Sequence, residues 1–133
     1  MIIGVGNDIT DIRRIENSLE RFGERFINRI FSSTEQQKAN RRKGNIRAYV
    51  STYAKRFAAK EAFMKAMGTG YADGVYFKDI SVVNDSHGKP DIELSGGALE
   101  AFRRVTGGKE AKLHLSMSDE YPYAFAVVIV ETL

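Results

Sequence analysis

The run from residue 45 to residue 70, NIRAYVSTYAKRFAAKEAFMKAMGTG, constrains the fold more than any other stretch of the chain. Asn45 suits a helix N-cap, alanine is frequent, no proline interrupts the run, and Gly68 with Gly70 is typical of a helix end. The pattern predicts a helix of about six turns. Charged and apolar residues alternate around its whole circumference, whereas a solvated surface helix separates them onto two faces. We therefore expect a central helix that is packed on most sides.

The charged residues of this helix favour phosphate chemistry. Arg56, Lys60 and Lys65 follow one another at spacings of one or two turns, and such a cationic array suits a polyphosphate. Glu61 is the one acid in the run, and a carboxylate among bases suits a divalent metal that bridges protein and phosphate. The alternative from these residues alone is an ordinary salt bridge between Glu61 and Lys65, with the other bases in solvent.

The chain begins with a short apolar strand over residues 2–5, which runs into the glycine-containing sequence GVGND. Glycine permits a turn and a close approach of the backbone, so we expect Asp8 at a strand end. Strand ends beside a helix start often carry ligand groups. From the residues alone, however, Asp8 and Asp11 suit turn or cap positions of the next helix equally well.

Helical spacing of apolar residues early in the chain and alternating strands late in it indicate an α+β fold. No internal repeat or linker is evident, so residues 1–133 form a single domain. Ser33 or Thr34 is expected to cap the third helix. The expected elements besides the central helix are helices over residues 11–22, 24–30 and 34–42, a strand hairpin over 75–85 and 89–94, a helix over 97–106, and strands over 112–118 and 123–131.

Composition limits the classes of function. A length of 133 residues is short for a self-contained enzyme pocket, so assembly into an oligomer is a natural way to complete one. The absence of cysteine excludes disulfides, thiolate metal sites and a cysteine nucleophile. No long apolar run or signal sequence is present, and we expect a cytoplasmic protein without a membrane span. The net charge is +3 with many bases between residues 13 and 56, which favours an acidic partner or an anionic ligand.

Two separated motifs then point to one family. The sequence GVGNDITDIRRIE resembles the metal-binding signature of the holo-acyl-carrier-protein synthases, and RFAAKEAFMKAMGTG resembles their second signature. The order and spacing of the motifs, the chain length, the KP-containing hairpin and the terminal LSMSDEYPYAFAVVIVE also fit. The resemblance covers essentially the whole chain and is to the stand-alone bacterial form of the 4′-phosphopantetheinyl transferases. It implies the fold of that superfamily, with an antiparallel sheet packed on a long central helix, and a homotrimer.

The resemblance implies transfer of 4′-phosphopantetheine from coenzyme A to a serine of apo-acyl carrier protein, with release of adenosine 3′,5′-bisphosphate, in fatty acid biosynthesis. Attack at a pyrophosphate phosphorus builds negative charge, so a metal and cations are the main requirement. By resemblance, Asp8 and Glu61 hold Mg²⁺. Magnesium keeps octahedral geometry and several waters, so two carboxylates and the pyrophosphate suffice as ligands.

The resemblance also implies roles for other residues. Lys65 steadies the pyrophosphate and completes a catalytic set with Asp8 and Glu61. The base that deprotonates the carrier serine stays open between a water held near Glu61 and Asp8 itself. The implied coenzyme A contacts are Arg56, Lys60, Lys65, Gly68, Thr69, Gly70 and Ser118.

In the family that the chain resembles, the coenzyme lies between neighbouring subunits of a trimer. Ser118 and Asp119, on the last hairpin, are therefore expected to reach a site that belongs largely to the adjacent chain. Many relatives have histidine at the second of these positions. An aspartate repels phosphate where a histidine donates to it, so the role of Asp119 departs from the family pattern.

The partners follow from the same resemblance. Arg14, Arg21 and Arg25 are expected to dock an acidic helix of the carrier protein, although solvated arginines explain the same pattern. A small RNA-binding module also accounts for these bases, but no RNA-binding motif is present, and we expect no nucleic-acid partner. A third hypothesis is a catalytically silent subunit that binds coenzyme A, which would have no need of Asp8 and Glu61.

Overall fold

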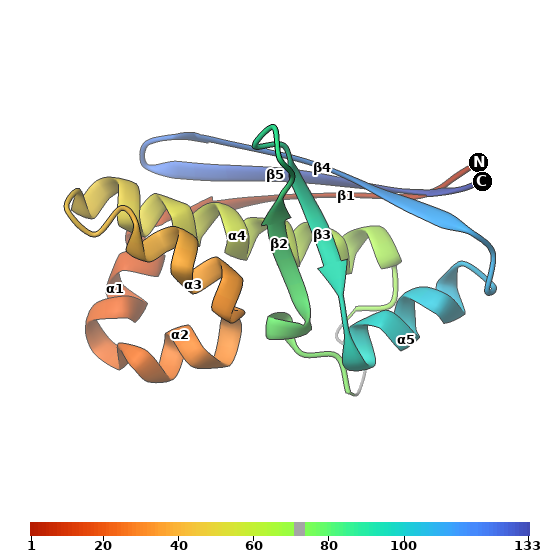
Figure 1. Ribbon diagram of the computed structural model, residues 1–133, viewed down its shortest axis with the longest axis horizontal. Helices are drawn as coiled ribbons and strands as arrows, with labels where there is room; N and C mark the ends of the chain where they lie inside the picture. The colour runs from red at the N-terminus through yellow and green to blue at the C-terminus, as the bar shows by residue number, and fades with distance from the viewer. Residues whose placement is uncertain (71–73) are drawn as a thin grey trace.

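A computed structural model of the chain describes residues 1–70 and 74–133, arranged in layers about the helix α4 (Ile46–Met67). Figure 1 shows a three-stranded sheet along one side of α4 and the other helices on the opposite side, while a two-stranded hairpin crosses α4 and reaches the sheet. The other elements are β1 (Ile2–Asp11), α1 (Ile12–Phe22), α2 (Glu24–Ile30), α3 (Ser33–Asn40), η1 (Phe77–Asp79), β2 (Ile80–Asn84), β3 (Pro90–Leu94), α5 (Gly96–Val105), β4 (Ala111–Glu120) and β5 (Tyr123–Thr132). Within the described ranges, no helix combines the length and the apolarity needed to cross a bilayer.

The central helix forms as its sequence predicts. The Asn45 side chain accepts a hydrogen bond from the Ala48 N–H at 3.2 Å, and Gly68 ends the helix in the left-handed conformation with φ of 71°. Most side chains of α4 are buried. The expectation of a helix packed on most sides is confirmed, and the α+β class is confirmed with it.

Strand β1 departs from the prediction because it does not turn at its glycines. It continues to Asp11 and pairs antiparallel with β5, so Asp8 lies inside the strand opposite Ala126. The glycines serve close packing instead. A Cβ on Gly4 would lie 2.0 Å from the Ala66 carbonyl oxygen, and one on Gly6 would lie 2.1 Å from that of Ala62. Only glycine allows the strand backbone to lie directly on the helix backbone.

The three-stranded sheet has the order β1-β5-β4, and all its pairs are antiparallel. Alternate residues of β5, from Ala124 to Val130, are buried against α4. The other face of the sheet points away from α4 and carries a stripe of apolar residues. We call these residues the outer sheet face, and they are Ile3, Val5, Ile9, Phe125, Val127 and Ile129.

Two apolar clusters surround α4, and both include residues of β5. Helices α1, α2 and α3 cover its first half, with Phe31 and Tyr53 at the centre, and the β2–β3 hairpin with α5 covers its second half around Phe63. Helix α3 begins with a capping box, in which the Ser32 hydroxyl accepts from the Glu35 N–H and the Glu35 carboxylate accepts from the Ser32 N–H. The cap is thus Ser32, and the expected Ser33 or Thr34 is wrong by one or two positions.

Candidate active site

Close packing of β1 on α4 places the two acids that the motifs single out on neighbouring elements. Gly4 lies over Ala66 and Gly6 lies over Ala62, so β1 and α4 run in opposite directions. Each step of two residues along β1 corresponds to one turn toward the N-terminus of α4. The same progression takes Asp8 to the turn of α4 that contains Glu61. Lys65 lies one turn after Glu61 on α4, and its Nζ is 3.3 Å from Asp8 Oδ1.

Asp8, Glu61 and Lys65 are all at least partly exposed, and we call these three residues the acid cluster. The Asp8 side chain is 17% exposed and that of Lys65 is 56% exposed. Asp8 Oδ2 also accepts a hydrogen bond from the buried Thr10 hydroxyl at 2.9 Å, which orients the carboxylate. In the part of the chain that the structure describes, no three potential metal-binding side chains come together. A donor set of two carboxylates, completed by ligand oxygens and water, is what Mg²⁺ accepts.

A second feature is a basic pocket of about 230 Å³ beside the first half of α4. Its walls come from α3, α4, the β2–β3 hairpin and β4, and no acidic side chain is among the described residues that line it. Burial lowers the pKa of Lys38, and the nearby Arg42 and Arg56 lower it further. Cations that repel one another in this way bind an anion favourably. The four bases of the basic pocket are Lys38, Arg42, Lys55 and Arg56.

Arg56 is the most unusual residue of the basic pocket. It is only 3% exposed, and burial lowers its pKa. Its two terminal nitrogens make long hydrogen bonds, at 3.3 Å to the Thr52 carbonyl oxygen and at 3.4 Å to Asn84 Oδ1. Its Nε has no hydrogen-bond partner among residues 1–70 and 74–133. A buried guanidinium that is this poorly satisfied is suited to an anion with several acceptor oxygens.

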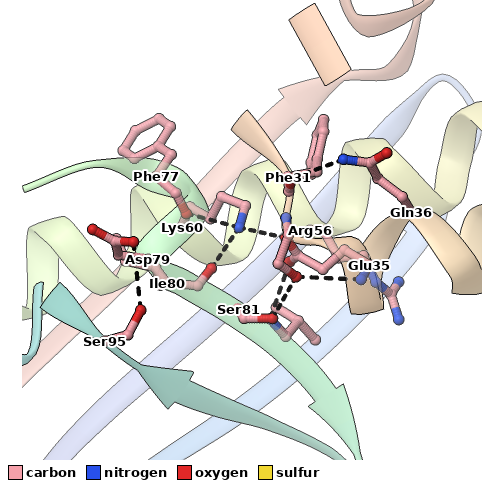
Figure 2. Close-up of polar contacts among 12 residues, drawn as sticks. Phe31, Glu35, Gln36, Arg56, Lys60, Phe77, Asp79, Ile80, Ser81 and Ser95 are labelled. Atoms are coloured by element: carbon pink, nitrogen blue, oxygen red, sulfur yellow. Dashed lines mark hydrogen bonds and ion pairs between the residues drawn. The ribbon is translucent and has the colours of Figure 1, made fainter. Parts of the chain in front are cut away.

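Lys60 lies elsewhere, and this position corrects the expectation that it binds the phosphates of coenzyme A. Its side chain is fully buried, and its Nζ donates to Glu35 Oε1 at 2.7 Å, to the Phe77 carbonyl oxygen at 2.9 Å and to the Ile80 carbonyl oxygen (Figure 2). An ammonium group has three N–H donors, and all three are used. The bases of α4 therefore do not form one array: Lys60 points to the interior, Arg56 to the basic pocket and Lys65 to Asp8.

The remaining predicted residues lie around these two features. Gly68, Thr69 and Gly70 are exposed at the end of α4, one turn beyond Lys65, and the rest of the glycine-rich loop includes residues 71–73, which lie outside the described residues. Along β4, Met117 lines the basic pocket, so the neighbouring Ser118 is directed to the outer sheet face.

Asp119 points back toward α4, where its Oδ1 lies 3.7 Å from the Nζ of Lys55. It therefore pairs with a base of the basic pocket within the same chain. The sequence interpretation did not single out Lys38, Arg42, Lys55 or Asn84, since these residues lie on separate elements. Lys55 could have been predicted from the sequence, because it directly precedes Arg56 at the start of the second motif.

The fold is an α+β domain in which the central helix carries Glu61 and Lys65 beside Asp8 of β1 and, one to two turns earlier, two bases of the basic pocket. The model of the 4′-phosphopantetheinyl transferase superfamily matches residues 4–126. The chain is 58% identical to holo-acyl-carrier-protein synthase of Paramagnetospirillum magneticum over 98% of this chain and 97% of that protein. It is 54% identical to the enzyme of the same name from Granulibacter bethesdensis, over 100% of this chain and 91% of that one.

Solved structures agree. The crystal structure of holo-acyl-carrier-protein synthase from Neisseria meningitidis superimposes with a TM-score of 0.83 at 38% identity, over 99% of this chain and 100% of that one. The Bacillus anthracis enzyme in complex with coenzyme A (3′,5′-ADP) gives a TM-score of 0.79 at 38% identity, over 100% and 99%. The chain belongs to the 4′-phosphopantetheinyl transferase superfamily and, within it, to the holo-acyl-carrier-protein synthases.

Proposed function

We propose that this enzyme transfers 4′-phosphopantetheine from coenzyme A to a serine hydroxyl of apo-acyl carrier protein in an Mg²⁺-dependent reaction. The names of its relatives and the coenzyme A complexes of the Bacillus anthracis and Helicobacter pylori enzymes support this reaction. The observation that carries the proposal is the poorly satisfied, buried Arg56 in a pocket of four bases, on the same helix as the acid cluster. The carrier that it accepts determines whether it serves fatty acid biosynthesis.

The two features suit different phosphate groups of coenzyme A. Arg56 and Glu61 are five residues apart on α4, which is about 7.5 Å along the helix axis and about 140° around it, so the two features open to different sides of α4. We assign the nucleotide phosphate to the basic pocket, and we assign the pyrophosphate to the acid cluster beside Lys65. Gly68, Thr69 and Gly70 then border the ligand at the end of α4. Lys60 is left out of this assignment because its donors are used in the interior.

In the proposed step, the carrier serine oxygen forms a bond to the phosphorus that bears pantetheine. The bond from that phosphorus to the bridging oxygen breaks, and adenosine 3′,5′-bisphosphate leaves with the electron pair. Asp8 and Glu61 would hold Mg²⁺, which would supply neutralisation of the negative charge that develops during transfer. The Lys65 ammonium binds the same developing charge. The serine proton passes either to Asp8, which the Thr10 hydroxyl orients, or to a water held near Glu61.

The outer sheet face supports assembly into a homotrimer. Val5 is 60% exposed and Ile9 is 66% exposed, and they continue an apolar stripe onto β5. A stripe of this kind is typical of a protein interface. Ser118 lies at the end of the same face, where it can reach the site of an adjacent copy. Sedimentation equilibrium is expected to give three times the chain mass of 14.9 kDa, and a monomer would contradict the proposal.

Exposed arginines on α1 and α2 are proposed to dock the carrier. Arg14 and Arg21 are seven residues apart and thus share one face of α1, and Arg25 follows on α2. Reversal of both charges, Arg14→Glu with Arg21→Glu, is expected to raise the KM for the carrier at least tenfold, because attraction of its acidic helix becomes repulsion. The KM for coenzyme A should stay within about twofold. Equal changes in both constants, measured by steady-state kinetics, would contradict docking at α1.

Intact-mass spectrometry tests the proposed function. An apo-acyl carrier protein incubated with coenzyme A, Mg²⁺ and this enzyme is expected to gain one phosphopantetheine group, and no gain is expected when EDTA replaces Mg²⁺. A gain in EDTA would contradict the metal requirement. Binding of coenzyme A without modification of any of several carriers would instead favour a silent coenzyme A-binding subunit.

A further inference from the structure

The strongest feature that the proposed function does not use is the ion pair between Glu35 and Lys60. Both side chains are 0% exposed, and the distance from Lys60 Nζ to Glu35 Oε1 is 2.7 Å. Figure 2 shows the pair between α3, α4 and the start of β2. Within the described part of the chain, Glu35 is the one buried carboxylate. An ion pair at this depth is unusual in so small a domain.

The pair connects separate elements because both oxygens of Glu35 and the ammonium group of Lys60 also bind backbone groups. Glu35 Oε1 accepts from the Ser32 N–H at 2.9 Å, and Oε2 accepts from the Val82 N–H at 3.0 Å. Lys60 donates to the Phe77 and Ile80 carbonyl oxygens. The N-terminus of α3, the middle of α4, and η1 with β2 are therefore joined at one point.

Each element that the pair connects also carries a residue of the basic pocket, one helix turn or one strand repeat away from the residue that takes part in the pair. Lys38 follows Glu35 by three residues on α3, and Arg56 precedes Lys60 by four residues on α4. Asn84 follows Val82 by two residues on β2, so the two share a face of that strand. One helix turn or one strand repeat thus links the ion pair to each of three pocket walls.

Stability alone does not account for such a pair. Desolvation of both charges offsets most of their attraction, and buried ion pairs replaced by apolar residues often leave stability unchanged or improved. Hydrogen bonds of fixed length and direction, in contrast, set the relative position of the elements that they join. A phosphate bound by long, flexible bases requires such fixed supports, because a shift of about 1 Å weakens every contact.

We propose that Glu35 and Lys60 are positioning residues for coenzyme A: they hold α3, α4 and β2 in the arrangement in which Lys38, Arg56 and Asn84 converge on one phosphate group. The proposal rests on the assignment of the nucleotide phosphate to the basic pocket. Neither residue touches the ligand. Their contribution is expected in the affinity for the nucleotide and not in the chemical step at Asp8 and Glu61.

The double variant Glu35→Gln with Lys60→Met tests this role. Glutamine keeps one acceptor oxygen for the backbone N–H groups of Ser32 and Val82, and methionine fills the space of the lysine stem, so the link to α4 is cut without leaving a buried charge unpaired. The lost hydrogen bonds are expected to lower the melting temperature, with the variant still folded at the temperature of the binding assay. Calorimetry is expected to give at least a tenfold higher Kd for adenosine 3′,5′-bisphosphate, with a matching rise in the KM for coenzyme A and a kcat within about twofold.

Two controls separate the possible outcomes. Glu100→Gln with Arg103→Met removes the same number of charges from the exposed face of α5 and should leave the Kd unchanged. Arg56→Met should weaken nucleotide binding if the basic pocket is the site. If Arg56→Met has no effect, the pocket assignment fails; if it weakens binding while the folded double variant binds normally, only the positioning role is overturned.

A second variant covers failure of the double variant to fold. Glu35→Asp keeps the charge and shortens the side chain by one methylene group, so the contacts of the carboxylate to α3, α4 and β2 are not all made at once. The positioning role requires a Kd for adenosine 3′,5′-bisphosphate at least threefold above that of the wild type. A folded Glu35→Asp variant with unchanged Kd overturns the proposal.

Discussion

Replacement of Glu61 by glutamine is expected to lower the rate of phosphopantetheine transfer at least about a hundredfold, which corresponds to about 2.7 kcal/mol. The amide keeps the size of the side chain but removes the negative charge of one of the two carboxylates proposed to hold Mg²⁺. The basic pocket lies on an earlier part of α4 and keeps its four bases. The Kd for adenosine 3′,5′-bisphosphate should therefore stay within about twofold of the wild-type value.

The measurement is a time course of carrier modification by intact-mass spectrometry at several Mg²⁺ concentrations. A shift of the half-maximal Mg²⁺ concentration to higher values, together with the slower rate, would place the loss at the metal. Glu100→Gln makes the same chemical change on the exposed face of α5 and should transfer at the wild-type rate. A Glu61→Gln enzyme with the wild-type rate and Mg²⁺ dependence would show that the second motif does not supply a metal ligand here.

Replacement of Gly6 by alanine is expected to have the largest effect on the fold, with a loss of about 3 kcal/mol in the free energy of unfolding. The added Cβ would lie 2.1 Å from the Ala62 carbonyl oxygen and 2.5 Å from the Ala66 nitrogen. Both atoms belong to the backbone of a helix that is packed on most sides, so neither can move aside cheaply. Strand β1 must lift from α4, and Asp8, two residues further along the strand, is displaced from Lys65.

Urea denaturation followed by circular dichroism measures the loss, and the transfer assay measures the displacement of Asp8. Gly44→Ala is the matched control, because a Cβ at Gly44 meets nothing within 4 Å, and its effect should stay within about 0.5 kcal/mol. If Gly6→Ala is as stable as Gly44→Ala and equally active, the close contact between β1 and α4 does not position the acid cluster.

Local chemistry was enough to predict the helices, whereas the strand expected over residues 2–5 runs to Asp11 and the strand expected over 75–85 is limited to Ile80–Asn84. The N-cap at Asn45, the left-handed glycine at position 68 and the apolar periodicity of α1 each act within a few residues, so their signals are complete in the sequence. Interleaved charge on α4 also predicted a helix packed on most sides. The motif resemblance added the acid pair of Asp8 and Glu61, and the packing of β1 on α4 brings Asp8 beside the turn that contains Glu61.

The sequence did not predict the direction of each charged side chain, because that direction depends on which element packs against it. The bases of α4 look alike in sequence, yet Lys60 meets Glu35, Arg56 meets a pocket and Lys65 meets Asp8. Likewise, glycine at positions 4 and 6 is compatible with a turn or with close packing, and only the presence of β5 and α4 decides for packing. Sequence by itself determined the helices and the chemical groups available, since these follow from interactions between near neighbours. The tertiary structure alone decided which charges are buried in pairs and which remain to bind phosphate, because desolvation and pairing depend on contacts between residues far apart in the chain.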